Sequence, residues 1–343
     1  MATKQELTKL LLDNYRGTGA IATEFSGMSK QEKDDKIRQA FFSVLGTDVV
    51  KDEIQLAKLL RSKGNEVFEI IENVITEGMI RGDWRNPFFE QFVEEHNLDL
   101  GDENTFYIEG RNELQVAKIA GDGVTVDRQR IDNGHILTVD MDTYGIAVYE
   151  YMIRALTGRT DFAVLVAKLN EAVEKGIKEQ TYVAFQSLLT KLPSLYTHSG
   201  GYDKEKILGV IQAVQVATGV KPQLVGTAVA LSKLQNKEIV HFSDSMKDER
   251  NRQGYLSTWE GYACLEVEQT QKVGQPGKYN FSNDEIYVIS GHEKPIKLTL
   301  RSGLIDPNGS GVRFQDRSMN FQYEFDMGIA VVTAGAIGRV SLV

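Results

Sequence analysis

The spacing of apolar residues over residues 1–98 predicts a series of short helices. Thr3 and Ser29 each stand three positions before a glutamate, which is the arrangement of a capping box at a helix start. Apolar residues follow both at helical spacing, the second run stops at Gly46, and two further helices are expected before residue 80. Because glycines separate these helices, we expect an extended arm, and we expect residues 1 to about 60 to pack against neighbouring molecules more than against their own core.

Between residues 105 and 148 the pattern changes to the alternation of apolar and polar residues that is typical of β-strands. Gly121-Asp122-Gly123 lies between two alternating runs, and Asn133-Gly134 is the pair that tight type I′ turns prefer. The sequence therefore predicts a long hairpin over about residues 105–137. Its few large apolar side chains cannot stabilise two strands in water, so the hairpin is either solvated or contacts a partner.

A long helix is expected from Asp161 to Leu192, because an apolar stripe at steps of three and four residues runs through the whole segment. At 1.5 Å per residue this helix is expected to be roughly 45 Å long. Glu171 and Lys175 have the spacing and orientation of a favourable ion pair on its polar face.

The rest of the chain alternates between helices and strands. Asp203 can cap a helix that ends at Gly219, and Thr227 can cap a shorter one. Residues 320–325 and 328–332 are expected to pair as a hairpin around Asp326-Met327-Gly328, and residues 247–252 to form a solvated loop. Other strands are expected over residues 223–226, 261–268, 285–290, 296–301 and 338–343.

Composition narrows the class of protein. The chain has 343 residues, of which 41% are hydrophobic, and this is typical of a folded protein of about two domains. No run reaches the ~20 apolar residues that a membrane helix needs. Its 48 acidic and 39 basic residues give a net charge of −9, which argues against a dedicated nucleic-acid-binding module. The single Cys264 excludes an internal disulfide and any multi-cysteine metal site, and its apolar neighbours predict that it is buried.

The known catalytic and ligand-binding motifs are not found, and we predict no catalytic residue, no metal and no cofactor. The sequence has no phosphate loop, dinucleotide fingerprint, serine nucleophile elbow or His-Glu-x-x-His pair, and its five histidines are scattered. Asp306 to Gly311 matches the first half of a calcium-binding loop. Arg317 stands where that loop requires a glutamate, so the segment is interpreted as a turn.

The order of these elements resembles that of the major capsid proteins of tailed bacteriophages of the Hong Kong 97 type. The most specific part is the helix over 203–218, followed by Lys221-Pro-Gln-Leu-Val-Gly226 and the helix over 227–234; residues 284–289, 292–297 and 326–332 are also similar. The resemblance covers most of the chain and implies an α+β fold. Its parts are a helical N-terminal arm (1–98), an extended β-hairpin called the E-loop (99–145), a peripheral (P) domain with a long spine helix (146–197), an α/β axial (A) domain (198–290) and strands that return to the P-domain (291–343).

The resemblance implies a structural protein that self-assembles as hexamers and pentamers into an icosahedral or prolate shell around double-stranded DNA. It implies a place in the virion after assembly in the host cytoplasm, portal and decoration proteins as partners, DNA enclosed without specific binding, and no membrane. Since the helical arm leaves little room for the cleavable scaffolding segment of many relatives, either a separate scaffolding protein or the loss of only a few residues is expected. The hairpin residues expected to contact an adjacent subunit are Arg111, Glu113, Lys118, Asp122, Asp127, Arg128, Arg130 and Asp132.

Two other functions fit the same sequence. One is an encapsulin-like compartment shell, which shares the fold and encloses cargo enzymes, and the other is a soluble α/β enzyme whose site is not recognised. Some relatives join an E-loop lysine to a P-domain asparagine. Lys118 and Asn320 are the residues that such a bond requires here, and we expect no cross-link because their spacing gives no support for one.

Overall fold

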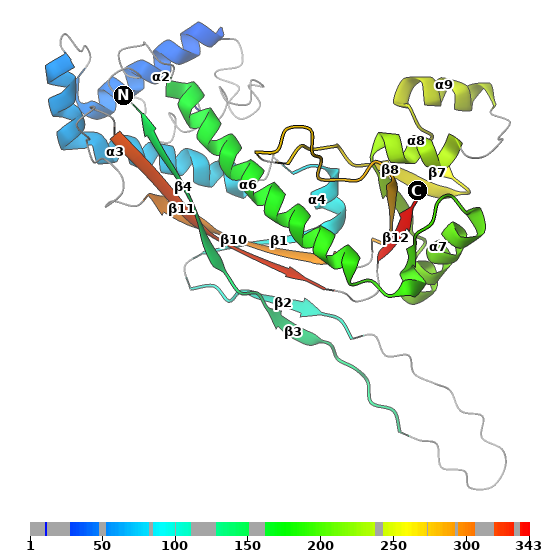
Figure 1. Cartoon of the computed structure of the whole chain (residues 1–343). Coiled ribbons are helices and arrows are strands. Elements are labelled where there is room, and N and C mark those ends of the chain that lie inside the picture. Colours follow the sequence, from blue (N-terminus) through cyan, green and yellow to red (C-terminus); the bar gives the residue numbers. More distant parts are fainter. Residues whose placement is uncertain are drawn as a thin grey trace, which may run out of the picture.

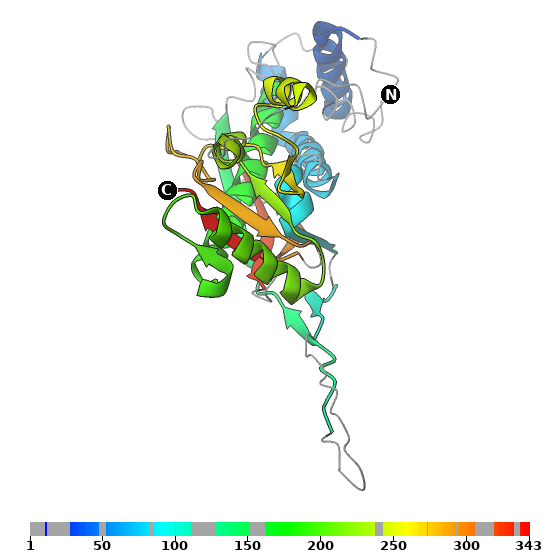
Figure 2. The same ribbon diagram turned by 90° about the vertical axis from the view of Figure 1, so that its right-hand side faces the viewer.

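The computed structural model describes residue 11 and residues 28–47, 53–81, 85–99, 101–110, 128–150, 162–236, 243–272, 274–291, 294–305, 319–332 and 337–343. These residues form two β-sheets with helices packed on them, and a two-stranded arm that extends away from both sheets (Figure 1, Figure 2). The fold is therefore α+β, as the sequence predicts.

The first sheet has four strands in the order β1, β10, β11, β4, which are Val93–Leu98, Ile296–Ile305, Met319–Val331 and Asp142–Glu150. β1 is parallel to β10, whereas β11 is antiparallel to both β10 and β4. The helices α3 (Glu53–Arg81) and α6 (Phe162–Thr190) cover one face of this sheet (Figure 1). We call that face the inner face and the opposite one the outer face.

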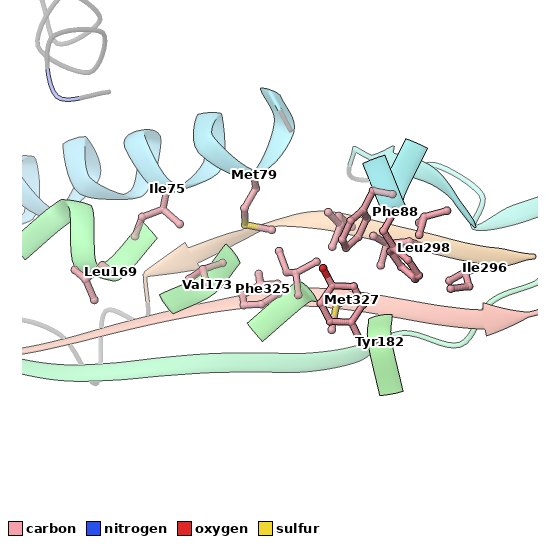
Figure 3. Packing of buried hydrophobic residues seen from close by; sticks show 14 of the residues in the cluster. Ile75, Met79, Phe88, Leu169, Val173, Tyr182, Ile296, Leu298, Phe325 and Met327 are labelled. Carbon is pink, nitrogen blue, oxygen red and sulfur yellow. The ribbon is translucent and has the colours of Figure 1, made fainter. Parts of the chain in front are cut away.

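The main hydrophobic core lies between the inner face and these helices. Figure 3 shows side chains that meet there: Ile75 and Met79 from α3, Leu169 and Val173 from α6, and Ile296, Leu298, Phe325 and Met327 from the sheet. Phe88 of the short helix α4 (Pro87–Phe92) is fully buried at one end of the core. Its ring lies at centroid distances of 4.7 to 5.2 Å from those of Phe92, Tyr182, Phe185 and Phe281.

The second sheet has six strands in the order β5, β12, β9, β6, β8, β7, which are Thr197–His198, Ile337–Ser341, Glu285–Ile289, Gln223–Gly226, Tyr262–Glu266 and Thr258–Trp259. It has its own core with the helices α7 (Lys204–Thr218) and α8 (Ala228–Asn236). The predicted caps are confirmed. Asp203 accepts a hydrogen bond from the Lys206 amide, and α7 ends at Gly219, whose φ of 70° is left-handed.

The arm begins with β2 (Thr105–Ile108) and β3 (His135–Thr138), which pair antiparallel and confirm the base of the predicted hairpin. The prediction that Asn133-Gly134 joins two successive strands is wrong, because residues 128–134 lie in no strand. Gly134 has the expected positive φ of 77°, but it lies at a close contact between the two limbs of the arm and not in a turn between two strands. A Cβ there would lie 2.2 Å from the backbone oxygen of Ile108, so glycine allows the two limbs to approach closely.

Three expectations for the first 98 residues are wrong. A single helix, α3, replaces the two that were expected, and residues 93–98 form the strand β1. The helix α2 (Lys30–Leu45) has the predicted capping box of Ser29 and Glu32. In this described part of residues 1–60, the inward side chains pack against their own chain and not against a neighbouring molecule. Phe41 and Leu45 are fully buried in the chain's own main core.

Two later segments also differ from the prediction. β11 is one strand of 13 residues, where a hairpin around Asp326-Met327-Gly328 was expected. Gly328 is not a turn residue but a contact point, because a Cβ there would lie 2.6 Å from the backbone oxygen of Asp140. Residues 247–252, expected as a loop, lie in the exposed helix α9 (Asp244–Gln253), which Ser243 caps at its start and Gly254 ends.

Candidate assembly site

The root of the arm packs on the outer face of the first sheet through alternate residues of β2. Phe106 and Ile108 are 1% and 4% exposed, whereas Tyr107 between them points away and is 62% exposed. The ring of Phe106 stacks on that of His96 in β1, at a centroid distance of 4.1 Å and an interplanar angle of 12°. On another side, Nζ of Lys297 in β10 lies 5.9 Å from the centroid of the Phe106 ring. One face of the arm is therefore fixed to the sheet.

Polar contacts complete this attachment. The side chain of Lys297 is 2% exposed and pairs with Glu94, its direct neighbour on β1. A buried ammonium group needs such a partner, since an unpaired charge in this position would destabilise the fold. Thr299, two residues along β10, donates to the amide oxygen of Asn104 at 2.6 Å, and the Val139 amide donates to the backbone oxygen of Asn104 at 3.2 Å. These bonds hold the chain just before β2 and just after β3.

The opposite face of the arm is apolar and exposed. Tyr107 and Ile136 are direct cross-strand partners, and they are 62% and 68% exposed. Ile131, a little further along the arm, is 63% exposed. The hydroxyl of Tyr107 donates to the backbone oxygen of Asn133, which keeps this ring beside the returning limb. Tyr107 and Ile136 therefore form an exposed apolar pair on this face of the arm.

The structure describes three of the eight hairpin residues predicted to contact a neighbour. Arg128, Arg130 and Asp132 are exposed and follow one another along the returning limb, and Asp132 Oδ1 accepts from the Gly134 amide at 3.1 Å. Arg111, Glu113, Lys118, Asp122 and Asp127 lie outside the described residues. Asn320 lies in β11, but Lys118 is not described, so the predicted absence of a cross-link stays a prediction.

Sequence reasoning missed the exposed apolar pair and the residues that attach the arm. Tyr107 lies in Thr-Phe-Tyr-Ile, where apolar side chains occupy both faces of a four-residue strand and the alternation gives no direction. The structure shows that Phe106 faces the first sheet, and this places Tyr107 and Ile136 on the opposite, exposed face of the arm. Lys297 gives no local signal either, because its partner Glu94 is 203 residues away in the chain.

The described residues contain no group of three His, Cys, Asp or Glu side chains that could hold a metal ion. Within the same residues, none of the helices is both long enough and apolar enough to cross a bilayer. Cys264 is buried as predicted, and burial raises the pKa of its thiol to about 11. The calcium-like segment 306–311 lies outside the described part of the chain.

Comparison with known proteins identifies a family for this chain. The family model described as "SPbeta prophage-derived putative capsid protein YonB" matches residues 6–341. A search of curated proteins finds no match. Among solved structures, the mature capsid of bacteriophage PhiM1 is similar over 75% of this chain and 87% of that one, with 12% identity and a TM-score of 0.48.

Two further structures are similar at the same level. The procapsid of satellite phage P4 matches over 91% of this chain and 98% of that one, with 12% identity and a TM-score of 0.46. A virus-like particle from Pyrococcus furiosus matches over 80% of this chain and 100% of that one, with 14% identity and a TM-score of 0.42.

The family match spans nearly the whole chain and favours the viral shell protein over the compartment shell and the soluble enzyme. The described elements are a helical start, a projecting hairpin, a long helix, an α/β sheet and two strands, β10 and β11, that return to the first sheet. The last strand, β12, pairs in the second sheet, so the expectation that residues 291–343 return together is wrong for this strand. The chain belongs to the YonB family of SPbeta prophage-derived capsid proteins, and it is a structural capsid protein that assembles into the capsid of the virion.

Proposed function

We propose that copies of this chain form hexamers and pentamers that close into an icosahedral or prolate shell around double-stranded DNA, with the arm of each copy lying across an adjacent copy. The observation that carries this proposal is the two-sided arm. Its Phe106 face is fixed to the sheet, and its Tyr107 face is apolar and exposed.

Physical chemistry favours a contact between copies at this surface. A two-stranded hairpin is at best marginally stable in water, so a projecting arm gains stability from a surface beyond its own root. Tyr107 and Ile136 together present an exposed apolar surface, and its removal from water by a partner is favourable. In a symmetric shell the same contact recurs in every copy, so modest contacts add up to a stable assembly.

The charge of the chain supports a container that does not bind its DNA specifically. Each contact between a basic side chain and a phosphate adds salt-dependent affinity, which would hold the genome against the wall. A net charge of −9 works against such contacts. The proposal includes assembly in the host cytoplasm, a separate scaffolding protein, a portal and decoration proteins as partners, and a structural rather than enzymatic role.

Replacing residues 112–130 by a short Gly-Ser linker tests the proposal. The root strands β2 and β3 and their contacts with the sheet stay in place, so we expect the thermal melt of the unassembled protein to change little. We expect shell formation, followed by sedimentation velocity and negative-stain microscopy, to be lost. Normal shells from the shortened protein, or a protein that simply unfolds, would show that the arm is not an intersubunit contact.

A further inference from the structure

We propose that the returning limb of the arm, residues 128–131, adds as a strand to the outer edge of β4 in the adjacent copy, with Arg128 and Arg130 facing Asp140 and Asp142. This inference rests on the proposed function, because it assigns the surface that receives the arm. It names the occupant as a second copy of this chain.

The first observation is the edge of the first sheet. Among the described residues, β4 pairs only with β11, so one side of this nine-residue strand carries backbone groups without a strand partner. The run from Thr143 to Tyr149 holds no charge and no proline. Natural edge strands usually carry such residues to prevent pairing with another chain, so β4 is suited to accept a strand.

The side chains of β4 leave room for a neighbour. Tyr144, Ile146 and Val148 pack against the main core, whereas the alternate residues Gly145 and Ala147 are small and exposed. A strand that approaches the edge beside Gly145 and Ala147 therefore meets only small side chains there. Pairing with β4 would satisfy its outward backbone groups, as strand addition does in other complexes.

The second observation is the match of charges. Asp142 is the first residue of β4 and Asp140 stands two positions before it, and both are exposed. Arg128 and Arg130 on the returning limb are also exposed and also stand two positions apart. Side chains two positions apart lie on the same face of a strand, and opposite charges that face each other across a strand pair are favourable. In one register of the proposed strand pair, each of the two aspartates can therefore lie opposite one of the two arginines.

The limb can take this role while the arm keeps its own pairing. Residues 128–131 are exposed and continue the arm beyond β3, away from both sheets (Figure 1). Residues 128–131 lie in no strand of their own copy, so their pairing with β4 would leave the β2–β3 pairing in place. The same geometry cannot be satisfied within one chain, since the limb leads away from the β4 of its own copy (Figure 1, Figure 2).

A charge exchange in the full-length protein tests the assignment. R128E/R130E and D140R/D142R are each expected to lower shell yield at least tenfold, measured by sedimentation velocity, while the thermal melt of the unassembled protein stays unchanged. The four substitutions together restore opposite charges, and we expect the yield to return to within about threefold of the original protein. K191E/K278E, at exposed sites outside the arm and the first sheet, controls for the change in net charge and is expected to assemble normally.

Hydrogen exchange gives an independent readout. We expect the amides of β4 that point away from β11 to exchange at least tenfold more slowly in assembled shells than in the unassembled protein. Failure of the combined variant to recover, normal assembly of R128E/R130E, or unchanged exchange in β4 would each overturn the inference. Slow exchange of β4 that persists in any R128E/R130E shells would assign the edge to another occupant and also overturn it. These results leave the linker experiment unaffected, so failure of the inference can be distinguished from failure of the proposed function.

Discussion

Replacing Ile136 by serine isolates the contribution of the exposed face of the arm. Ile136 is 68% exposed in the single chain, and it lies opposite Tyr107. Full burial of an isoleucine side chain is worth about 1.5–3 kcal/mol, so covering the exposed two thirds contributes about 1–2 kcal/mol to each contact. A difference of about 1.4 kcal/mol is tenfold in an equilibrium constant, and we therefore expect a roughly tenfold weaker contact.

The assay is the critical protein concentration for shell formation, measured by light scattering, alongside the thermal melt of the unassembled protein. We expect Ile136→Ser to raise the critical concentration about tenfold, because the contact recurs throughout the shell. We expect the melt to stay the same, since the side chain is exposed in the single chain.

Ile108→Ser is the matched control on the other face of the arm, where the side chain is only 4% exposed. Placing a hydroxyl there loosens the root and lowers the stability of the unassembled protein by about 2–4 kcal/mol. Assembly of Ile136→Ser at the original critical concentration, or a loss of stability as large as that of Ile108→Ser, would contradict the reasoning.

Three further substitutions and conditions test the fold itself. Phe88→Ala removes the ring at the centre of the aromatic cluster and should lower the free energy of unfolding by about 3–5 kcal/mol in chemical denaturation; a loss below about 1 kcal/mol would contradict the packing. Gly303→Ala places a Cβ 1.8 Å from the backbone oxygen of Glu324 and should destabilise by about 1–3 kcal/mol, whereas an unchanged melting temperature would refute this close approach. Burial raises the pKa of Cys264 to about 11, so its stabilising effect is present in full below the ordinary thiol pKa and is lost as the pH rises towards 11. Stability should therefore fall between pH 9 and 11, and Cys264→Ala should remove part of this fall.

Local signals in the sequence predict the helices well, because helix ends depend on near neighbours. The capping box of Ser29 and Glu32, the caps at Asp203 and Thr227, and the stop at Gly219 all lie within a few residues of the groups they satisfy. The long helix over 161–192 is confirmed as α6 for the same reason, since its apolar stripe is continuous.

Strands whose partners are distant were harder to predict. β1 follows directly from a helix and reads Val-Glu-Glu-His-Asn-Leu, so its sequence gives little strand signal. Its partner β10 lies about two hundred residues later, and the parallel pairing is held by the contact of Glu94 with Lys297. The interpretation of Gly328 as a turn fails for a related reason, since the glycine is required by residues 139–141 of another segment.

That the hairpin contacts an adjacent copy stays a prediction. Charge and low apolar content singled out the hairpin, and the structure confirms that Arg128, Arg130 and Asp132 are exposed on it. The direction of the arm could not be predicted, because it depends on the stacking of Phe106 with His96 across two strands that no local pattern brings together.

Cryo-electron microscopy of shells assembled from the full-length protein tests the central claim most directly. The map should show residues 105–138 leaving their own first sheet at Phe106 and lying across an adjacent copy, with Tyr107 and Ile136 buried between the two. A closed shell in which the exposed face of the arm touches only its own copy or solvent would contradict the claim, as would a protein that forms no shell under any assembly condition.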